Sequence, residues 1–186
     1  MPPLIMLIRH AEKPVPGRAP FGVSVDGAPD PESLTPRGWQ RAGALVGMFV
    51  GSATEGRPSR LPTPTHLFAS RIGPGSSSRR PFETLQPLSE RLGLTIDSRF
   101  LKEELGQLAE GARGIDGVGL ISWEHHLLPA LANMLVGDTT SAPQIWPDDR
   151  FDIVWLIDLR APAGRTRFRQ VPELLLGGDQ AGVIPA

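Results

Sequence analysis

The 186-residue chain contains no cysteine. Disulfide bridges, a thiolate nucleophile and a cysteine-ligated metal are therefore all excluded. The apolar run Leu4–Ile8 is far too short to span a bilayer, and it ends at the charged Arg9. It also lacks the basic leader and the cleavage site of a secretory signal. We therefore expect a cytoplasmic protein that does not act on membranes.

An excess of charge of either sign is also missing. Lysine and arginine together number 19 and aspartate and glutamate 20, which gives a formal net charge of -1. This balance provides no whole-protein field that would attract nucleic acid or an anionic membrane. We expect no nucleic-acid binding, and any affinity for an anionic ligand must come from a local cluster.

Glycine and proline, by contrast, are abundant, with 21 and 20 residues. They concentrate in Pro14–Pro31, Gly51–Pro64 and Gly73–Ser78. Because apolar periodic segments resume after each stretch, we expect long ordered loops around a site rather than linkers. The length suits one domain over residues 1–186, with a single hydrophobic core.

The hydrophobic pattern alternates between strands and helices. Strands are expected at Leu4–Ile8, Thr65–Ala69, Gly117–Ser122 and Phe151–Leu159, with Thr166–Val171 beside the last. Helices are expected from Pro36 behind a Thr35 N-cap, from Pro81, over Leu101–Ala109, and from about Leu127 to Val136. Pro87 should kink or divide its helix. This order predicts a three-layer α/β domain with a mostly parallel central sheet.

Two histidines lie just beyond the ends of predicted strands. His10 comes after the first strand and His125 after Gly117–Ser122, and ligands of α/β sheets bind outside the carboxyl ends of strands. A neutral imidazole is a competent nucleophile near pH 7. The guanidinium of Arg9 could hold phosphoryl oxygens in a bidentate fork. On these residues alone, a surface arginine, a hydrogen-bonded loop histidine and a capping pair of histidines explain the sequence as well.

A Gly/Ser-rich loop, Gly73–Ser78, leads into a helix that starts with Arg79 and Arg80. Cations at a helix N-terminus oppose the helix dipole, so two of them are unfavourable unless an anion or an acidic partner compensates. The helix after His125 would also direct free backbone N–H groups toward an anion. These features favour an anionic ligand, although a solvated arginine remains an alternative for one of the pair.

Four blocks occur in the order found in the histidine phosphatase (phosphoglycerate mutase-like) superfamily, and they resemble its small bacterial branch. L-I-R-H-A-E-K-P at Leu7–Pro14 is similar to its R-H-G/A-E signature, and L-T-P-R-G-W-Q-R-A at Leu34–Ala42 to its L-T-x-x-G-x-x-Q-A helix. R-P-F-E-T at Arg80–Thr84 is similar to R-A-x-Q-T, and W-E-H-H at Trp123–His126 to the block with the second catalytic histidine. Four blocks in order are far more specific than any one.

The resemblance implies a metal-independent phosphatase that needs no cofactor and acts on a phosphorylated small molecule or a phosphoprotein. His10 would take the phosphoryl group from a phosphomonoester or phosphohistidine, and water would then release phosphate. Arg9, Arg80 and His125 would surround the transferred group and stabilise its charge. The resemblance also implies a phosphoglycerate mutase-like fold.

Two assignments depart from the family pattern. Arg71 and Arg79 compete with Arg80 as the second phosphate-binding arginine, and Arg80 is preferred because it directly precedes Pro81. Glu103 occupies the family's L-x-E position for a general acid, but it also fits the solvated face of a short helix. The segment between Glu103 and His125 is too short for the usual helical lid, which favours an open site.

Three other functions compete with this assignment. A mutase-type phosphotransferase or a non-catalytic module that binds a phosphorylated ligand could use the same fold. A metal-dependent hydrolase could draw ligands from the histidines, but H-E-x-x-H is absent. The P-loop motif G-x-x-x-x-G-K-[ST] and the serine-hydrolase motif G-x-S-x-G are missing as well.

Overall fold

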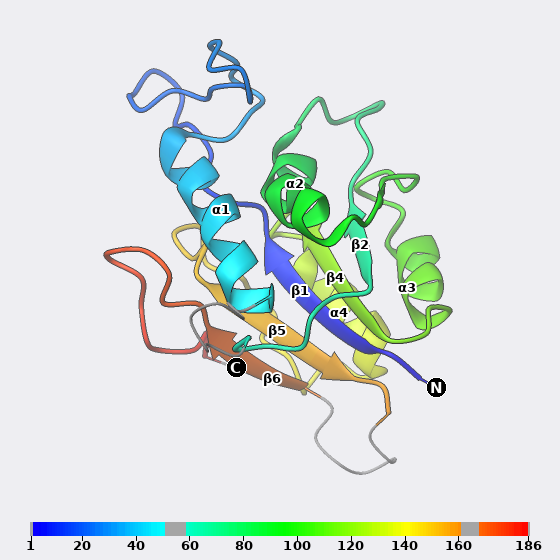
Figure 1. The fold of residues 1–186 in the computed structure, drawn as a ribbon. Coiled ribbons are helices and arrows are strands. Elements are labelled where there is room, and N and C mark those ends of the chain that lie inside the picture. The colour runs from blue at the N-terminus through cyan, green and yellow to red at the C-terminus, as the bar shows by residue number, and fades with distance from the viewer. Residues whose placement is uncertain (1, 51–58, 161–167, 186) are drawn as a thin grey trace.

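The computed structural model describes residues 2–50, 59–160 and 168–185. Its strands are β1 (Leu4–Arg9), β2 (His66–Ala69), β3 (Ile96–Asp97), β4 (Val118–Trp123), β5 (Ile153–Asp158) and β6 (Phe168–Pro172). Its helices are α1 (Pro36–Val50), α2 (Arg80–Leu92), α3 (Leu105–Arg113) and α4 (Leu128–Val136) (Figure 1). None of the helices in these ranges is long and apolar enough to cross a membrane.

The strands form one six-stranded sheet in the order β3-β2-β4-β1-β5-β6. β3, β2, β4 and β1 run parallel, whereas β5 pairs antiparallel with both β1 and β6. The predicted α/β class with a mostly parallel sheet is therefore confirmed. β1 has a partner strand on each side and all of its residues are buried, as its unbroken aliphatic run predicts.

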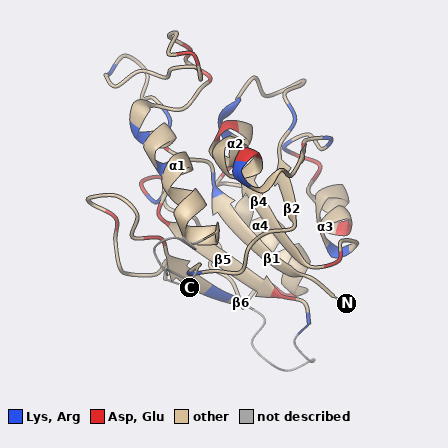
Figure 2. Cartoon of the chain, viewed as in Figure 1, with Lys and Arg blue, Asp and Glu red and all other residues tan. Residues whose placement is uncertain are grey.

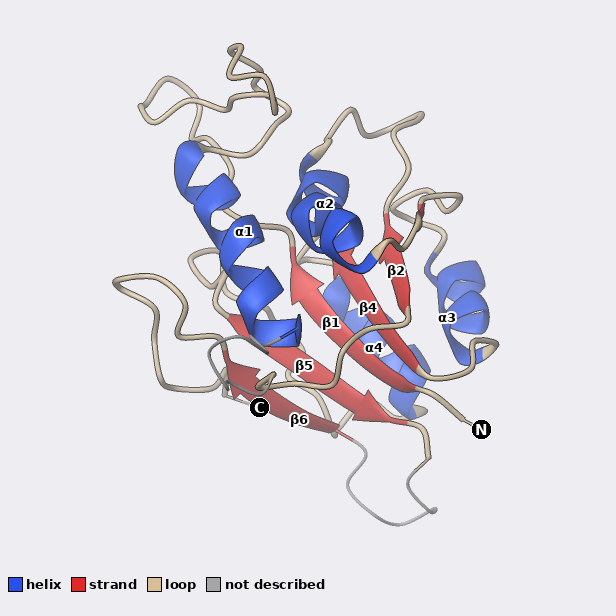
Figure 3. Ribbon diagram, in the orientation of Figure 1, coloured by secondary structure: helices blue, strands red, loops and turns tan. Residues whose placement is uncertain are grey.

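Side chains of β1 alternate between two hydrophobic clusters. Met6 packs in the cluster that contains residues of α1 and α2, and Ile5 in the one that contains residues of α3 and α4. The helices thus cover both faces of the sheet (Figure 3). Figure 2 shows few charged residues along the central strands, so the charges gather in loops and at helix ends.

The start of α1 follows the signal in the local sequence. The Oγ1 of Thr35 accepts a hydrogen bond from the backbone N–H of Gly38 at 3.2 Å, so the predicted N-cap of α1 is confirmed. The short β3 was not expected. Residues 51–58 of the loop Gly51–Pro64, and residues 166–167 of the expected strand Thr166–Val171, lie outside the described part.

Two helix predictions are corrected by the structure. α2 continues through Pro87, so the proline does not divide the helix, and the kink stays a prediction. Leu85 and Leu88 on either side of Pro87 are both fully buried and hold this part of α2 against the sheet. α3 begins at Leu105 instead of at residue 101. The Glu104 carboxylate accepts the backbone N–H of Leu101 at 2.8 Å, and this contact holds residues 101–104 in a turn.

A buried ion cluster around Arg41 fastens the C-terminal segment to α1. Its guanidinium donates to Glu173 Oε2 at 2.8 Å and to Asp179 Oδ1 at 2.7 Å, and it also pairs with Glu12 at 2.9 Å. Burial raises the pKa of Glu173 against the opposing pull of Arg41. Burial also acts to raise the pKa of Asp179, but the hydrogen bonds from Arg41 and from the backbone N–H groups of Leu176 and Leu175, together with the charge of Arg41, outweigh it and lower the pKa to about 2. The arginine therefore compensates carboxylates that have lost most of their hydration.

Replacing Arg41 by methionine should lower the free energy of unfolding by about 3–5 kcal/mol, because it leaves buried carboxylates without their cation. Arg37 is the matched control. It pairs with the same Glu12 and Asp179, but its side chain is 43% exposed. Arg37→Met should cost less than about 1 kcal/mol. Urea denaturation at pH 7 measures both, and equal costs for the two variants would contradict a central role for Arg41.

Candidate functional site

His10 directly follows β1 at the carboxyl edge of the sheet. Its backbone N–H donates to the carbonyl of Trp123 at 3.0 Å, which continues the β1–β4 pairing by one residue. The imidazole is buried, with 4% of the residue exposed, and its Nδ1 lies 2.8 Å from the carbonyl oxygen of Ala11. Because a carbonyl only accepts, Nδ1 carries the proton and Nε2 keeps its lone pair.

The surroundings of His10 hold it in the neutral form. Burial lowers its pKa most, and the positive charges of Arg9, Arg80 and Lys13 act in the same direction. Against the opposing effect of the Ala11 hydrogen bond, these causes together lower the pKa to about 3. The imidazole is therefore unprotonated at neutral pH. A neutral imidazole with an unprotonated Nε2 is the form that can act as a nucleophile.

Residues of the R-P-F-E-T block fix the chain just after His10. The Oγ1 of Thr84 accepts the backbone N–H of Ala11 at 2.8 Å and donates to the carbonyl of Arg80 at 2.7 Å. Glu83 is buried, and its carboxylate accepts from the Oγ of Ser33 at 2.6 Å. These contacts join the start of α2 to the loops that flank the histidine.

Residues at the start of α1 hold the backbone of Glu12, the residue after Ala11, in the same way. The carbonyl of Glu12 accepts from the backbone N–H of Thr35 at 2.9 Å and from its hydroxyl at 3.1 Å. Gly38 approaches so closely that a Cβ on it would lie 2.6 Å from the Glu12 carbonyl oxygen. Only glycine fits at this contact. Three of the sequence blocks therefore meet around the segment that follows His10.

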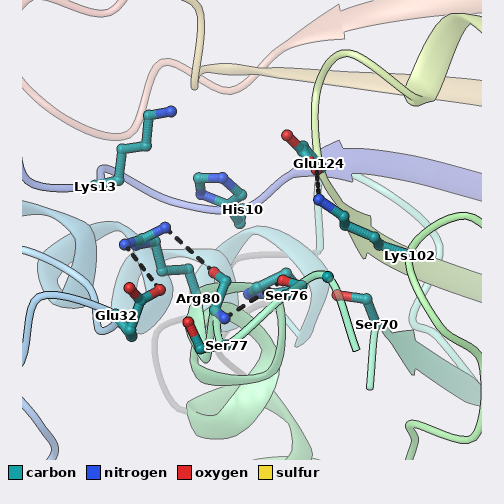
Figure 4. A pocket seen from close by; sticks show the side chains of 12 residues that line it. His10, Lys13, Glu32, Ser70, Ser76, Ser77, Arg80, Lys102 and Glu124 are labelled. Carbon is teal, nitrogen blue, oxygen red and sulfur yellow. Dashed lines mark hydrogen bonds and ion pairs between the residues drawn. The ribbon is translucent and has the colours of Figure 1, made fainter. Parts of the chain in front are cut away.

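A small cavity of about 240 Å³ opens beside His10 (Figure 4). It is lined by His10, Lys13, Glu32, Ser70, Gly75, Ser76, Ser77, Ser78, Arg80, Pro81, Lys102 and Glu124. Its size suits a phosphoryl group together with a small part of the molecule that carries it. Figure 4 shows the imidazole among the lining side chains, with Lys13, Arg80 and Lys102 around it.

The charged groups of this cavity leave an excess of positive charge. Glu32 lies 3.6 Å from Arg80, and Glu124 lies 3.7 Å from Lys102. Lys13 makes no ion pair with any residue that the structure describes. Three cations against two carboxylates in a partly buried cavity favour an anionic ligand.

Acidic partners also explain how α2 tolerates two arginines at its start. Arg80 pairs with Glu32 and donates to the carbonyl of Pro31 at 2.6 Å, while Arg79 lies 3.4 Å from Asp30. These contacts offset the unfavourable helix dipole. The arginine pair alone therefore does not require an anion, and the case for one rests on the cavity as a whole.

Arg9 does not line this cavity. Its guanidinium donates to the backbone carbonyls of Pro147, Asp148 and Arg150 at 3.3, 2.6 and 3.2 Å. It also lies over the ring of Phe151, 3.7 Å from the centroid. Burial lowers its pKa to about 10, which still leaves it charged at pH 7. In this arrangement Arg9 fastens the segment before β5 to the end of β1, and its predicted phosphate contact stays a prediction.

His125 does not line the cavity either. Its Nε2 lies 2.6 Å from Oδ1 of Asp148, and burial lowers its pKa to about 4 although Asp148 opposes the shift. Its ring is close to that of His126, with centroids 3.8 Å apart. Donor atoms of these three residues lie within 4.8 Å of one another, so they are the described residues best placed to hold a metal ion. The predicted role of His125 in catalysis remains a prediction.

The remaining predicted residues lie outside the cavity as well. Glu103 is 59% exposed in its side chain and pairs with Lys102 at 3.5 Å. Arg71 lines a neighbouring cavity. Sequence reasoning missed Lys13, Lys102 and Glu124, although Lys13 and Glu124 lie within two recognised blocks, because a strand-end pattern does not reveal which side chains turn toward the site.

A search of protein-family models finds no match, and neither does a comparison with curated proteins. Among solved structures, the chain is similar to "Mycobacterial hydrolase 2", with 14% sequence identity and a TM-score of 0.43. The alignment covers 96% of this chain and 92% of that chain.

The buried neutral His10 should make the protein less stable as the pH falls. In the unfolded chain histidine takes up a proton near pH 6.5, whereas folded His10 resists protonation until about pH 3. The stabilisation is therefore complete above about pH 6.5 and is lost as the pH falls toward 3, by about 1.4 kcal/mol per pH unit. His10→Gln should flatten this slope between pH 6 and about 4.5, as measured by urea denaturation.

His126→Gln serves as the control, because the His126 side chain is 65% exposed. It should keep the pH dependence of the unmodified protein. An unchanged slope in His10→Gln would show that the folded protein protonates His10 as readily as the unfolded chain does.

Proposed function

We propose that the protein is a metal-independent phosphatase of the histidine phosphatase type, built on the three-layer phosphoglycerate mutase-like fold. It would release phosphate from a phosphomonoester or a phosphohistidine through a phosphohistidine on His10. The observation that carries the proposal is a buried, neutral imidazole with an unprotonated Nε2, beside a small cavity with three cations.

The first step is an in-line displacement. The lone pair of His10 Nε2 forms a bond to phosphorus while the bond from phosphorus to the leaving oxygen breaks. Lys13, Arg80 and Lys102 offset the negative charge of the phosphoryl oxygens, the work that metal ions do in other phosphoryl-transfer enzymes. Nδ1 keeps its proton throughout, since the Ala11 carbonyl holds it.

The second step is hydrolysis of the phosphohistidine. Water attacks phosphorus, the bond to Nε2 breaks, and the imidazole recovers its lone pair. Glu124 lines the cavity and pairs with Lys102, and a carboxylate beside an ammonium group serves better as a proton acceptor than as a donor. We assign to Glu124 the proton that the attacking water loses. With no acid assigned to the leaving group, substrates with good leaving groups should react fastest.

His10→Ala should abolish phosphate release, because the variant lacks the atom that bonds to phosphorus. Less than a tenth of the unmodified turnover of 4-nitrophenyl phosphate is expected, with an unchanged circular dichroism spectrum. The trapped phosphoenzyme of the unmodified protein should be acid-labile and stable to alkali. Activity should survive EDTA, and loss of activity that a divalent metal restores would support the metal-dependent alternative at His125, His126 and Asp148 instead.

Arg80→Ala should reduce kcat/KM by about 10²–10³, as expected when one charged donor is removed from a preorganised site. The adjacent Arg79 is the matched control, because its side chain is 59% exposed and it does not line the His10 cavity. Arg79→Ala should change kcat/KM only a few-fold. The reverse order would show that the second arginine of the site has been assigned to the wrong residue.

Glu124→Gln should slow the second step selectively, so that phosphoenzyme accumulates and a burst of leaving group precedes a slow steady state. Glu103→Gln is the control, since Glu103 pairs with the same lysine, Lys102, but does not line the cavity. It should show neither effect. Rapid-quench measurement of phosphoenzyme tests both variants, and accumulation in the Glu103 variant alone would return the proton-transfer role to Glu103.

A further inference from the structure

A second cavity of about 470 Å³ lies next to the His10 cavity, and Ser70 lines both. We call it the Arg71 cavity. Three large apolar side chains line it while exposed to solvent: Val25, Ile72 and Phe82 are 65%, 53% and 41% exposed. They come from three segments, the loop before α1, the loop after β2, and the first turn of α2.

Exposed apolar side chains that converge on one cavity indicate a binding site, because single exposed apolar residues on a surface are common but clusters are not. A volume of a few hundred Å³ is typical of small-molecule sites, and here the three apolar side chains stand among polar and charged ones that could orient a ligand. The ring of Phe82 adds a flat surface against which another flat group can stack.

The Arg71 cavity also offers a cation. The guanidinium of Arg71 makes no ion pair with any of the residues that the structure describes. Arg79 lines the same cavity but pairs with Asp30, and Glu83 is committed to Ser33 and the backbone of Leu34. Asp26 also lines the cavity and offers a carboxylate, which does not bind an anion. Arg71 is therefore the cation in this cavity that can bind an anionic group of a ligand, and its planar guanidinium can bind a carboxylate in a bidentate fashion.

We propose that the Arg71 cavity holds the part of the substrate that is not transferred. The substrate would be a phosphomonoester whose flat apolar body carries a second anionic group for Arg71. This inference rests on the proposed phosphatase function. The His10 cavity of about 240 Å³ is small, so the body of a larger ester must extend beyond it. The adjoining cavity across Ser70 offers three exposed apolar side chains and a cation.

Three aryl phosphates with leaving groups of similar acidity test the proposal: phenyl phosphate, 2-naphthyl phosphate and 6-carboxy-2-naphthyl phosphate. For the unmodified protein, kcat/KM should rise about tenfold with the second ring and about tenfold again with the carboxylate, since each tenfold gain corresponds to one good contact. Phe82→Ala should lose the first gain and Arg71→Ala the second. Both variants should keep their turnover of phenyl phosphate.

Ile145→Ala is the matched surface control, since Ile145 is 76% exposed and lines neither cavity. It should retain both gains. Arg71→Lys, which keeps the charge but loses the planar fork, should retain part of the second gain.

Binding of the dephosphorylated product, 6-hydroxy-2-naphthoate, separates this inference from the proposed function. Calorimetry should show binding to the unmodified protein and at least tenfold weaker binding to Arg71→Ala, whether or not the protein turns over any phosphate ester. If no ester is hydrolysed, the phosphatase proposal fails, and product binding alone then tests whether the Arg71 cavity binds a flat anionic molecule. Equal kcat/KM for the three esters, or equal product binding by the two proteins, would overturn the assignment.

Discussion

The buried guanidinium of Arg41 is the contact on which the arrangement of the site depends. It joins Glu12, two residues after the proposed nucleophile, to Glu173 and Asp179 in the C-terminal segment. Taking these charges out of water is costly, and only the complete set of partners compensates the cost. The chain around His10 therefore cannot move independently of α1 or of the C-terminal segment. This constraint adds to the direct contacts of His10 with the carbonyls of Trp123 and Ala11, and together they fix the position of the imidazole.

Desolvation keeps the His10 imidazole neutral, and the same effect should lower the stability of the protein in acid. The same burial that keeps the imidazole neutral prevents it from taking up the proton that an unfolded chain would bind. Nearby cations act in the same direction, and they also make the cavity attractive to an anion. The proposed nucleophile and the proposed phosphoryl-binding environment thus depend on one electrostatic arrangement. An anionic substrate would complete it by offsetting the excess positive charge.

Several residues of the recognised blocks hold the backbone around the site in place and do not line its cavity. Thr84 holds the backbone N–H of Ala11, Gly38 allows α1 to approach Glu12, and Arg9 binds the carbonyls of the segment before β5. Their positions in the sequence signatures are explained by these contacts. Arg9 shows the difference most clearly. Its place next to the proposed nucleophile suggests a phosphate ligand, while its observed partners are backbone carbonyls.

Local patterns in the sequence determined the α/β class, the buried β1 and the N-cap of α1, because each depends on neighbouring residues only. They also placed His10 at the carboxyl end of a strand and Arg80 at the start of a helix, and the structure brings both to one cavity. Tertiary packing decided the rest. Buried Leu85 and Leu88 carry α2 through Pro87. Packing also turns Lys102 and Glu124 toward the cavity and keeps Arg9 and His125 out of its lining. These positions depend on loops that are distant in sequence and meet only when the sheet has formed.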